Sequence, residues 1–461
     1  MLPEPLLQSL ENVKGFNQEA FEAVHQSGEQ ITSIRINPKK EVAGYQLQVI
    51  HGEQTVASNQ QLATVPWCPY GFYLETRPSF TLDPSFHAGA YYVQEASSMF
   101  LWEALKQTVG NTIQQKVLDL CAAPGGKSTL LSTYFDDGLV VSNEVIKSRA
   151  NILVENITKW GNDNVVVTNN DPQHFQQLPN FFDVIVVDAP CSGSGLFRRD
   201  PNAIDEWSEN NVQLCGQRQQ RILADVLPAL KEGGILIYST CSYSEAEDEE
   251  IADWLVEELG MESLPLVLQD DWNVIETISS KQKAHGYRFY PDKVKGEGFF
   301  IAAFKKTIAS EEKKLKEQSL TLPSKQELLV MQSFIQLPET YSIFKHSDYL
   351  KAMPQQWVQD VKNLSAHLYI KKAGTDLGAV KGKDFVPQHE LAVSSLSLAD
   401  MASIELSKED ALEYLRRKDV VVDAPRGWTL VKYNGLALGW IKVLPNRINN
   451  YYPQEWRVLK T

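Results

Sequence analysis

Few cysteines and no paired metal ligands occur in this sequence of 461 residues. Only five cysteines are present, and no two of them form a C-x-x-C pair; they lie at positions 68, 121, 191, 215 and 241. This excludes a zinc ribbon and argues against a disulfide framework. The eight histidines include no H-x-x-x-H pair, so we expect no metal site. Any chemical role for the thiols is therefore nucleophilic.

Long apolar runs are also missing. No stretch approaches the roughly 20 uncharged apolar residues that cross a bilayer, and residues 1–15 lack the basic start and apolar core of a signal peptide. We therefore expect a cytoplasmic protein with no membrane partner. We also expect a monomer. The chain is too long for one hydrophobic core, which predicts two to four domains.

An overall positive charge, which would favour nucleic acid, is absent as well. The formal net charge is −14, but residues 321–461 carry 18 basic and 15 acidic residues, which leaves a net of −17 for the first 320. Much of the acid lies in 244–262, which is typical of the solvated face of a helix. The segment 281–295 has five basic residues against one acidic residue. The net charge of the chain therefore does not exclude RNA, because binding of RNA depends on local basic patches.

The middle of the chain alternates strand and helix patterns. Apolar runs typical of strands buried on both faces occur at 116–120, 139–144, 164–169, 183–189 and 234–240, with a closing strand at 296–306. Helical spacing occurs at 148–161 and 210–230. The alternation predicts an α/β, doubly wound sheet, whose ligands bind beyond the carboxyl ends of the strands.

Composition suggests four parts of the chain. An aromatic and proline-rich module covers 1–88, the sheet domain covers 89–307, a charged linker and a first C-terminal domain cover 308–385, and a final domain covers 386–461. The charged linker itself is expected at 305–325.

A small-residue loop, CAAPGGKST, follows the first predicted strand. A P-loop would need glycine at position 121, where Cys121 stands, so a nucleoside triphosphate is disfavoured. A strand ending in Asp119 before such a turn lets backbone approach a cofactor at a helix N-terminus. Glu144 and Asp171, which follow the next two strands, are placed to bind a ribose diol and an adenine amino group. Each carboxylate alone is equally typical of a turn cap; together they favour an adenosine-type cofactor.

Three motifs, DLCAAPGGKST (119–129), DAPCSGSG (188–195) and YSTCSYSEAEDEE (238–250), resemble those of the Nol1/Nop2/Sun family of RNA 5-methylcytosine methyltransferases. HAGAYYVQEASSM (87–99) and GEGFFIAAFKK (296–306) are similar to further motifs of that family. The resemblance covers roughly 85–306. It implies a Rossmann-like class I methyltransferase sheet, S-adenosylmethionine as cofactor and RNA as partner.

The C-terminal segments 377–394 and 438–457 resemble the tail of bacterial small-subunit rRNA methyltransferases. This resemblance implies a C-terminal PUA-like RNA-binding domain, an N-terminal RNA-binding module and 16S rRNA or the small ribosomal subunit as partner. Aromatic residues interleaved with cations near both ends of the chain suit unstacked RNA, although such clusters are as often core. One departure is Asp292, where the family pattern has histidine; we expect it to affect RNA contact rather than chemistry.

The chemistry explains why two thiols follow two strands. Carbon 5 of cytosine is a poor nucleophile until a thiolate adds to carbon 6. By resemblance Cys241 is the nucleophile and Cys191 the release residue, while Asp188 holds N3 of the base. Lys127 is a candidate to stabilise the thiolate, or a surface residue beside the loop. Cys215 and Cys68 are expected in the core.

The resemblance also implies the cofactor-binding residues. They are Cys121, Ala122, Ala123, Pro124, Gly125, Gly126, Lys127, Glu144, Arg149, Asp171 and Asp188. Cys121 forms pocket wall, and Arg149 orients Glu144 or is an exposed helix arginine. Arg198 and Arg199 hold the RNA backbone or solvate a loop.

Two rival functions stay open at this point. A DNA cytosine methyltransferase would need a single thiol in a Pro-Cys-Gln setting, whereas this sequence has Pro-Cys-Ser and two thiols. A catalytically silent RNA-binding assembly factor could keep the same fold. Intact cofactor and cysteine motifs argue against it.

Overall fold

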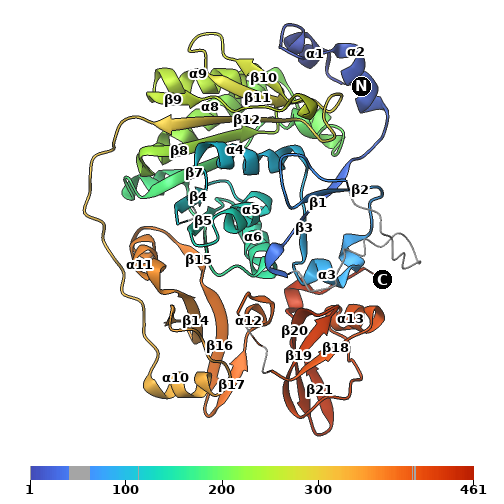
Figure 1. Ribbon diagram of the computed structural model, residues 1–461, viewed down its shortest axis with the longest axis vertical. Helices are drawn as coiled ribbons and strands as arrows, with labels where there is room; N and C mark the ends of the chain where they lie inside the picture. The colour runs from blue at the N-terminus through green and yellow to red at the C-terminus, as the bar shows by residue number, and fades with distance from the viewer. Residues whose placement is uncertain (1, 41–62, 113, 397, 399–400, 461) are drawn as a thin grey trace.

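A mixed ten-stranded sheet forms the centre of the molecule. The computed structural model describes residues 2–40, 63–112, 114–396, 398 and 401–460. The order of the strands is β10-β11-β12-β8-β7-β4-β5-β6-β15, and β9 pairs with β12 (Figure 1). Their bounds are β4 Lys116–Asp119, β5 Leu139–Asn143, β6 Val165–Thr168, β7 Phe182–Asp188, β8 Leu230–Thr240, β9 Met261–Leu264, β10 Ile275–Ile278, β11 His285–Phe289, β12 Phe299–Lys306 and β15 Ile370–Ala373.

Helices cover both faces of this sheet, which confirms the predicted doubly wound α/β fold. Strands β4 to β8 are parallel, and β12 runs antiparallel beside β8. One face packs against α4 (Leu101–Thr108), α5 (Gly126–Tyr134) and α6 (Lys147–Trp160), and the other against α8 (Glu209–Val226), α9 (Glu249–Glu257) and α11 (Val358–His367). Side chains alternate between the two cores, as in β4, where Val117 faces one and Leu118 the other. All six predicted strands are present.

A three-stranded sheet of order β2-β1-β3 precedes the central domain. It contains β1 (Thr32–Ile36), β2 (Gly71–Leu74) and β3 (Tyr91–Val93), with α1 (Glu4–Leu10), α2 (Gln18–Gln26) and α3 (Pro84–His87) nearby. The predicted boundary after residue 88 lies just before β3, which pairs with β1. Residues 41–62 of the predicted module lie outside the described residues.

The charged segment after β12 carries no helix or strand from 307 to 320 and runs along the left side of the view to α10 (Figure 1). It leads to a four-stranded sheet, β13-β14-β16-β17. The elements there are α10 Lys325–Gln332, β13 Tyr341–His346, β14 Tyr349–Pro354, β16 Thr375–Lys381 and β17 Asp384–Pro387. Between them, β15 leaves this unit and pairs antiparallel with β6. The first C-terminal region is therefore joined to the central sheet, which the sequence did not predict.

A second four-stranded sheet, β18-β19-β20-β21, ends the chain. Its elements are α12 His389–Val393, β18 Ser403–Glu405, α13 Lys408–Leu415, β19 Gly427–Tyr433, β20 Leu436–Leu444 and β21 Arg447–Asn450. The predicted boundary between 385 and 386 falls within β17, which pairs with β16. No helix in the described part of the chain is both long and apolar enough to cross a membrane.

Candidate active site

The carboxyl ends of the parallel strands open onto a cavity of about 340 Å³. Asp119 and Asp188 are the last residues of β4 and β7, and Cys241 follows the last residue of β8. The predicted site residues that line the cavity are Cys121–Pro124, Gly126, Lys127, Arg149, Asp188 and Cys241. Gly125, Glu144, Asp171 and Cys191 lie outside its wall. The structure thus gathers both catalytic and cofactor candidates at one edge of the sheet.

The small-residue loop turns directly into α5. Gly125 has φ +118°, a conformation that side chains rarely adopt, and it precedes the first residue of the helix. Arg149 donates to the carbonyl of Ala123 at 2.7 Å, and Asn156 donates to that of Pro124 at 2.8 Å. Helix α6 therefore holds the loop, while the free amides of the α5 N-terminus face the site.

Glu144 is buried at the end of β5. One of its oxygens accepts from the amide of Ile146 at 2.9 Å, and the other lies 3.5 Å from Arg149. Asp171 caps a short helical turn by accepting from the amide of Gln173 at 3.1 Å. The other oxygen of Asp171 lies 3.8 Å from Arg221, so both carboxylates have the local bonds of a turn cap and an arginine nearby.

Asn143, which the sequence reasoning missed, fastens the loops after three strands to one another. Its amide group donates to the carbonyls of Leu120 and Asn170, and its oxygen accepts from Thr168. A buried amide can satisfy several loops at once because it both donates and accepts. The asparagine in the run SNE, at the end of a strand, was the available signal.

The two predicted catalytic thiols are in contact. The sulfur atoms of Cys191 and Cys241 lie 2.8 Å apart, and both cysteines are free. The hydrogen bond to Cys241, together with burial, raises the pKa of the Cys191 thiol well above its ordinary value. Cys191 therefore carries its proton at neutral pH, and only Cys241 lines the cavity.

Lys127 pairs with Asp188 at 2.8 Å, and the hydroxyl of Ser239 donates to the same carboxylate at 2.8 Å. Burial acts to lower the pKa of Lys127, but the charge and hydrogen bond of Asp188 raise it. Its side chain is 13% exposed, so the alternative of a surface lysine is wrong. A fixed positive charge therefore stands beside the predicted base-binding residue.

Close backbone packing joins the loops that carry the thiols. The amide of Gly195 donates to the carbonyl of Cys241 at 2.8 Å, and its carbonyl accepts from Gly298 at 3.2 Å. A Cβ atom on Gly195 would lie 2.5 Å from the oxygen of Gly298, which no side chain tolerates. The DAPCSGSG, YSTCS and GEGFF motifs are therefore parts of one packed unit.

The acidic run at 244–262 is partly buried, which corrects the expectation of a solvated helix face. Glu247 is fully buried and accepts from the amide and hydroxyl of Ser192 and the hydroxyl of Ser242. Gln219 donates to it as well. Burial raises the pKa of Glu247, although these hydrogen bonds oppose the shift. The sequence pattern suggested a solvated helix face because the hydrogen-bond donors that satisfy the buried carboxylate lie on other elements.

Arg288, one of the five basic residues of the segment 281–295, is buried, although Lys281, Lys283 and Lys295 of the same segment are exposed. Its guanidinium is buried against Glu249, lies 3.2 Å from Asp248 and donates to the carbonyl of Tyr243 at 2.7 Å. Burial acts to raise the pKa of Glu249, but the charge and hydrogen bonds of Arg288 lower it. This arginine supports the Cys241 loop and is not available to RNA.

The other residues predicted to contact RNA lie in different environments. Arg198 is 4% exposed and donates to the carbonyls of Gly296 and Glu29, so it packs the loop. Arg199 lines the cavity. The side chain of Asp292 is 5% exposed and pairs with Lys293 at 3.2 Å, which leaves it little surface for RNA.

The N-terminal sheet braces the site, which sequence reasoning did not predict. Buried Arg35 donates to the side chain of Gln94 at 2.9 Å and to the hydroxyl of Thr129 in α5. Burial lowers its pKa to about 10. The HAGAYYVQEASSM segment is thus the contact between this sheet and the cofactor loop.

Glu297 is a further missed residue of the cavity wall. Its amide donates to the carboxylate of Glu95 at 2.9 Å, and one of its own buried oxygens has no hydrogen-bond partner among the described residues. Burial raises its pKa to about 7, against the charge of Arg198. It can therefore take up or release a proton near neutral pH.

Three parts of the chain match known family models. Residues 107–305 match the family model 16S rRNA methyltransferase RsmB/F, residues 2–96 match the N-terminal domain of 16S rRNA methyltransferase RsmF, and residues 402–458 match the methyltransferase RsmF PUA domain.

Relatives extend over most of the chain. Ribosomal RNA small subunit methyltransferase F of Aliivibrio salmonicida is 33% identical and covers 86% of this chain and 85% of its own. That of Vibrio cholerae is 29% identical over 98% of this chain and 97% of its own.

Solved structures are similar in fold over about two thirds of the chain. A methyltransferase homolog from Pyrococcus horikoshii has a TM-score of 0.50 at 27% identity, covering 66% of this chain and 100% of its own. NSun6 from Pyrococcus horikoshii with SFG has a TM-score of 0.52 at 18% identity, covering 66% of this chain and 98% of its own, and shows the fold alone.

Proposed function

This chain belongs to the RsmB/F family of 16S rRNA methyltransferases, and from that membership we propose that it methylates carbon 5 of a cytosine in the rRNA through a covalent adduct with Cys241. S-Adenosylmethionine is the proposed methyl donor. The observation that carries the proposal is the contact between the Cys191 and Cys241 sulfur atoms, 2.8 Å apart, beside a cavity that Asp188 also lines.

Cys241 begins the reaction. Its thiolate adds to carbon 6 of the cytosine, which breaks the C5–C6 double bond and makes carbon 5 nucleophilic. A proton shared between N3 and Asp188 neutralises the charge that reaches the ring. Lys127 pairs with Asp188 at 2.8 Å and so places a positive charge beside this step.

S-Adenosylmethionine, when bound beside Asp188, would supply the electrophilic methyl group that carbon 5 takes up. Release then needs loss of the carbon 5 proton to a base, which restores the double bond and expels the Cys241 thiolate. Glu297, with a pKa of about 7 and a place in the cavity wall, is the candidate base. Cys191 keeps its proton and donates a hydrogen bond to the departing sulfur, which stabilises the thiolate.

The residues at the strand ends fit the cofactor. The loop Cys121–Lys127 offers backbone amides at the start of α5, and one buried oxygen of Asp119 has no partner among the described side chains. Glu144 and Asp171 would bind the ribose and the adenine through their carboxylates, with Arg149 beside Glu144 and Arg221 beside Asp171. Asp188 would face the methyl donor from β7.

A methyl-transfer assay tests this function. Purified protein is incubated with labelled S-adenosylmethionine and 16S rRNA, and the nucleosides are separated by mass. The expected product is 5-methylcytidine, lost in Cys241→Ala and retained in Cys215→Ala, a buried thiol on α8 outside the site. A label on another base, or no transfer by the parent protein, contradicts the proposal; the second result would favour the silent assembly factor.

A further inference from the structure

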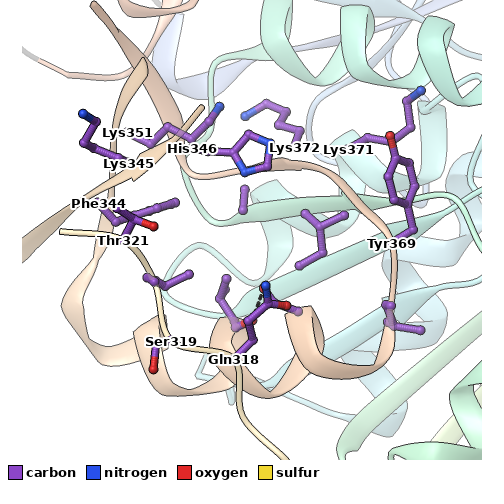
Figure 2. A pocket seen from close by; sticks show the side chains of 16 residues that line it. Gln318, Ser319, Thr321, Phe344, Lys345, His346, Lys351, Tyr369, Lys371 and Lys372 are labelled. Carbon is purple, nitrogen blue, oxygen red and sulfur yellow. Dashed lines mark hydrogen bonds between the residues drawn. The ribbon is translucent and has the colours of Figure 1, made fainter. Parts of the chain in front are cut away.

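A second cavity, of about 330 Å³, lies where the linker meets the first C-terminal unit. Its walls come from four elements: the linker at 318–321, the β13–β14 hairpin, α11, and the chain entering β15. Figure 2 shows four lysines and His346 gathered toward one side of this space, with Gln318 and Ser319 on the other. The cationic side chains are Lys345, Lys351, Lys371 and Lys372.

The wall of this cavity is positive. Its described lining residues include four lysines and no aspartate or glutamate. Three of these lysines have carboxylate partners that stand outside the wall: Lys345 pairs with Glu327 at 2.6 Å, Lys351 with Asp376 at 3.4 Å and Lys372 with Glu390 at 2.5 Å. A lysine ammonium group has three N–H donors. A carboxylate that pairs with it from outside the cavity leaves other donors for an anion inside the cavity.

Lys371 differs from the other lysines of this wall. Its ammonium group donates to the neutral side-chain oxygen of Asn151 in α6, at 2.6 Å. Its positive charge is therefore neutralised by no carboxylate within bonding distance in the described structure. Buried or half-buried cations of this kind are typical of phosphate sites.

An aromatic ring stands at the edge of the same cavity. Tyr369 is 63% exposed, and Figure 2 shows its ring beside Lys371. A large exposed ring next to a cation provides a face on which a nucleobase can stack while the phosphate binds the lysine. Gln318, Ser319 and Thr321 add polar groups that can donate to a sugar or base.

Backbone contacts tie this cavity to the catalytic domain. The amide of Tyr369 donates to the side chain of Asn170 at 2.9 Å, and its carbonyl accepts from the amide of Asn169 at 3.1 Å. These asparagines directly precede Asp171, the predicted adenine contact. A ligand that stacks on Tyr369 would therefore lie next to the chain segment that leads to the cofactor candidate Asp171.

We infer that this cavity binds a phosphate-bearing nucleotide of the single-stranded part of the rRNA substrate. The phosphate binds Lys371 with help from Lys345, and the base stacks on Tyr369. The volume suits about one nucleotide. The inference rests on the proposed activity toward RNA and assigns to this cavity a role in holding the substrate beyond the methylated base.

Point variants test the inference, because deleting the C-terminal region would also remove β15 from the central sheet. Binding of 16S rRNA made by transcription is measured against salt for the parent, Lys371→Ala, Tyr369→Ala and Tyr369→Phe. Lys371→Ala should weaken binding roughly tenfold or more and lower the salt slope by about 0.7. Tyr369→Ala should weaken binding roughly five- to a hundredfold, whereas Tyr369→Phe, which keeps the ring, should bind like the parent.

Controls separate this inference from the proposed function. Lys305→Ala removes an exposed lysine of β12 and should leave affinity and salt slope unchanged. The melting temperatures of the cavity variants should match the parent, which separates lost binding from lost folding. Parental affinity and salt slope in both Lys371→Ala and Tyr369→Ala would overturn the inference. So would cytidine monophosphate binding that depends on Lys371 while rRNA affinity does not. If the parent binds RNA but transfers no methyl group, the proposed function fails and the inference stands.

Discussion

Glu247 accepts two hydrogen bonds from Ser192, one from its amide at 2.8 Å and one from its hydroxyl at 2.5 Å. The same carboxylate accepts from the hydroxyl of Ser242 at 2.7 Å. Ser192 follows Cys191 and Ser242 follows Cys241, so a single buried carboxylate sets the spacing of the two thiols. Its place between the loops makes it a positioning residue.

Replacing that carboxylate should separate the thiols. Glu247→Gln keeps the shape but introduces an amide group that cannot accept all four donors. We expect a loss of stability of about 1–3 kcal/mol and a fall in the methyl-transfer rate of roughly a hundredfold from misplaced sulfur atoms. Single-turnover kinetics and thermal melting measure the two effects. Glu250→Gln, in the same acidic run but exposed, is the matched control. Parental rates in Glu247→Gln would show that the spacing of the thiols does not depend on this residue.

The ribose assignment predicts a specific loss of cofactor affinity in Glu144→Ala. Each hydrogen bond from a hydroxyl group to a carboxylate contributes roughly 1.5–3 kcal/mol, so the dissociation constant for S-adenosylmethionine should rise at least tenfold. Calorimetry measures it directly. The control is Glu155→Ala. Glu155 lies in α6 and accepts a hydrogen bond from Lys159, so this variant should bind the cofactor normally. Unchanged affinity in Glu144→Ala would refute the assignment.

The raised pKa of Asp119 predicts that the stability of the parent protein, compared with Asp119→Asn, depends on pH. Burial raises the pKa of this carboxyl to about 7, although Ser128 donates to it at 2.6 Å. The folded protein therefore keeps the proton between about pH 4 and 7 while the unfolded chain loses it, so the contribution of Asp119 to stability falls as pH rises through that window.

Asp119→Asn cannot ionise and lacks this dependence. Its free energy of unfolding, relative to the parent, should increase from pH 4 to 7 and then level off, by at most about 4 kcal/mol. Denaturant titrations at several pH values measure the difference. A difference that stays constant from pH 4 to 8 would contradict the pKa shift of Asp119.

The sequence predicts the strands and the motifs well because both depend on local pattern. The apolar runs ending at Asp119 and Asp188 gave the strand ends, and hence the edge where Cys241 would lie. What the sequence could not predict are contacts between distant segments. The burial of Glu247, the brace from Arg35 and the pairing of β15 with β6 all depend on partners that are far away in the chain. A charged residue reads as solvated until its buried partner is known.

The most direct test of the account asks which thiol holds the RNA. Parent, Cys191→Ala, Cys241→Ala and the double variant are incubated with labelled 16S rRNA and S-adenosylmethionine and run on a denaturing gel. Without Cys191 the methylated base should stay bonded to Cys241, because nothing donates a hydrogen bond to the departing sulfur. A shifted band is therefore predicted for Cys191→Ala and for neither variant that lacks Cys241. A band in Cys241→Ala but not in Cys191→Ala would exchange the two roles, and normal turnover in both single variants would contradict covalent catalysis by these cysteines.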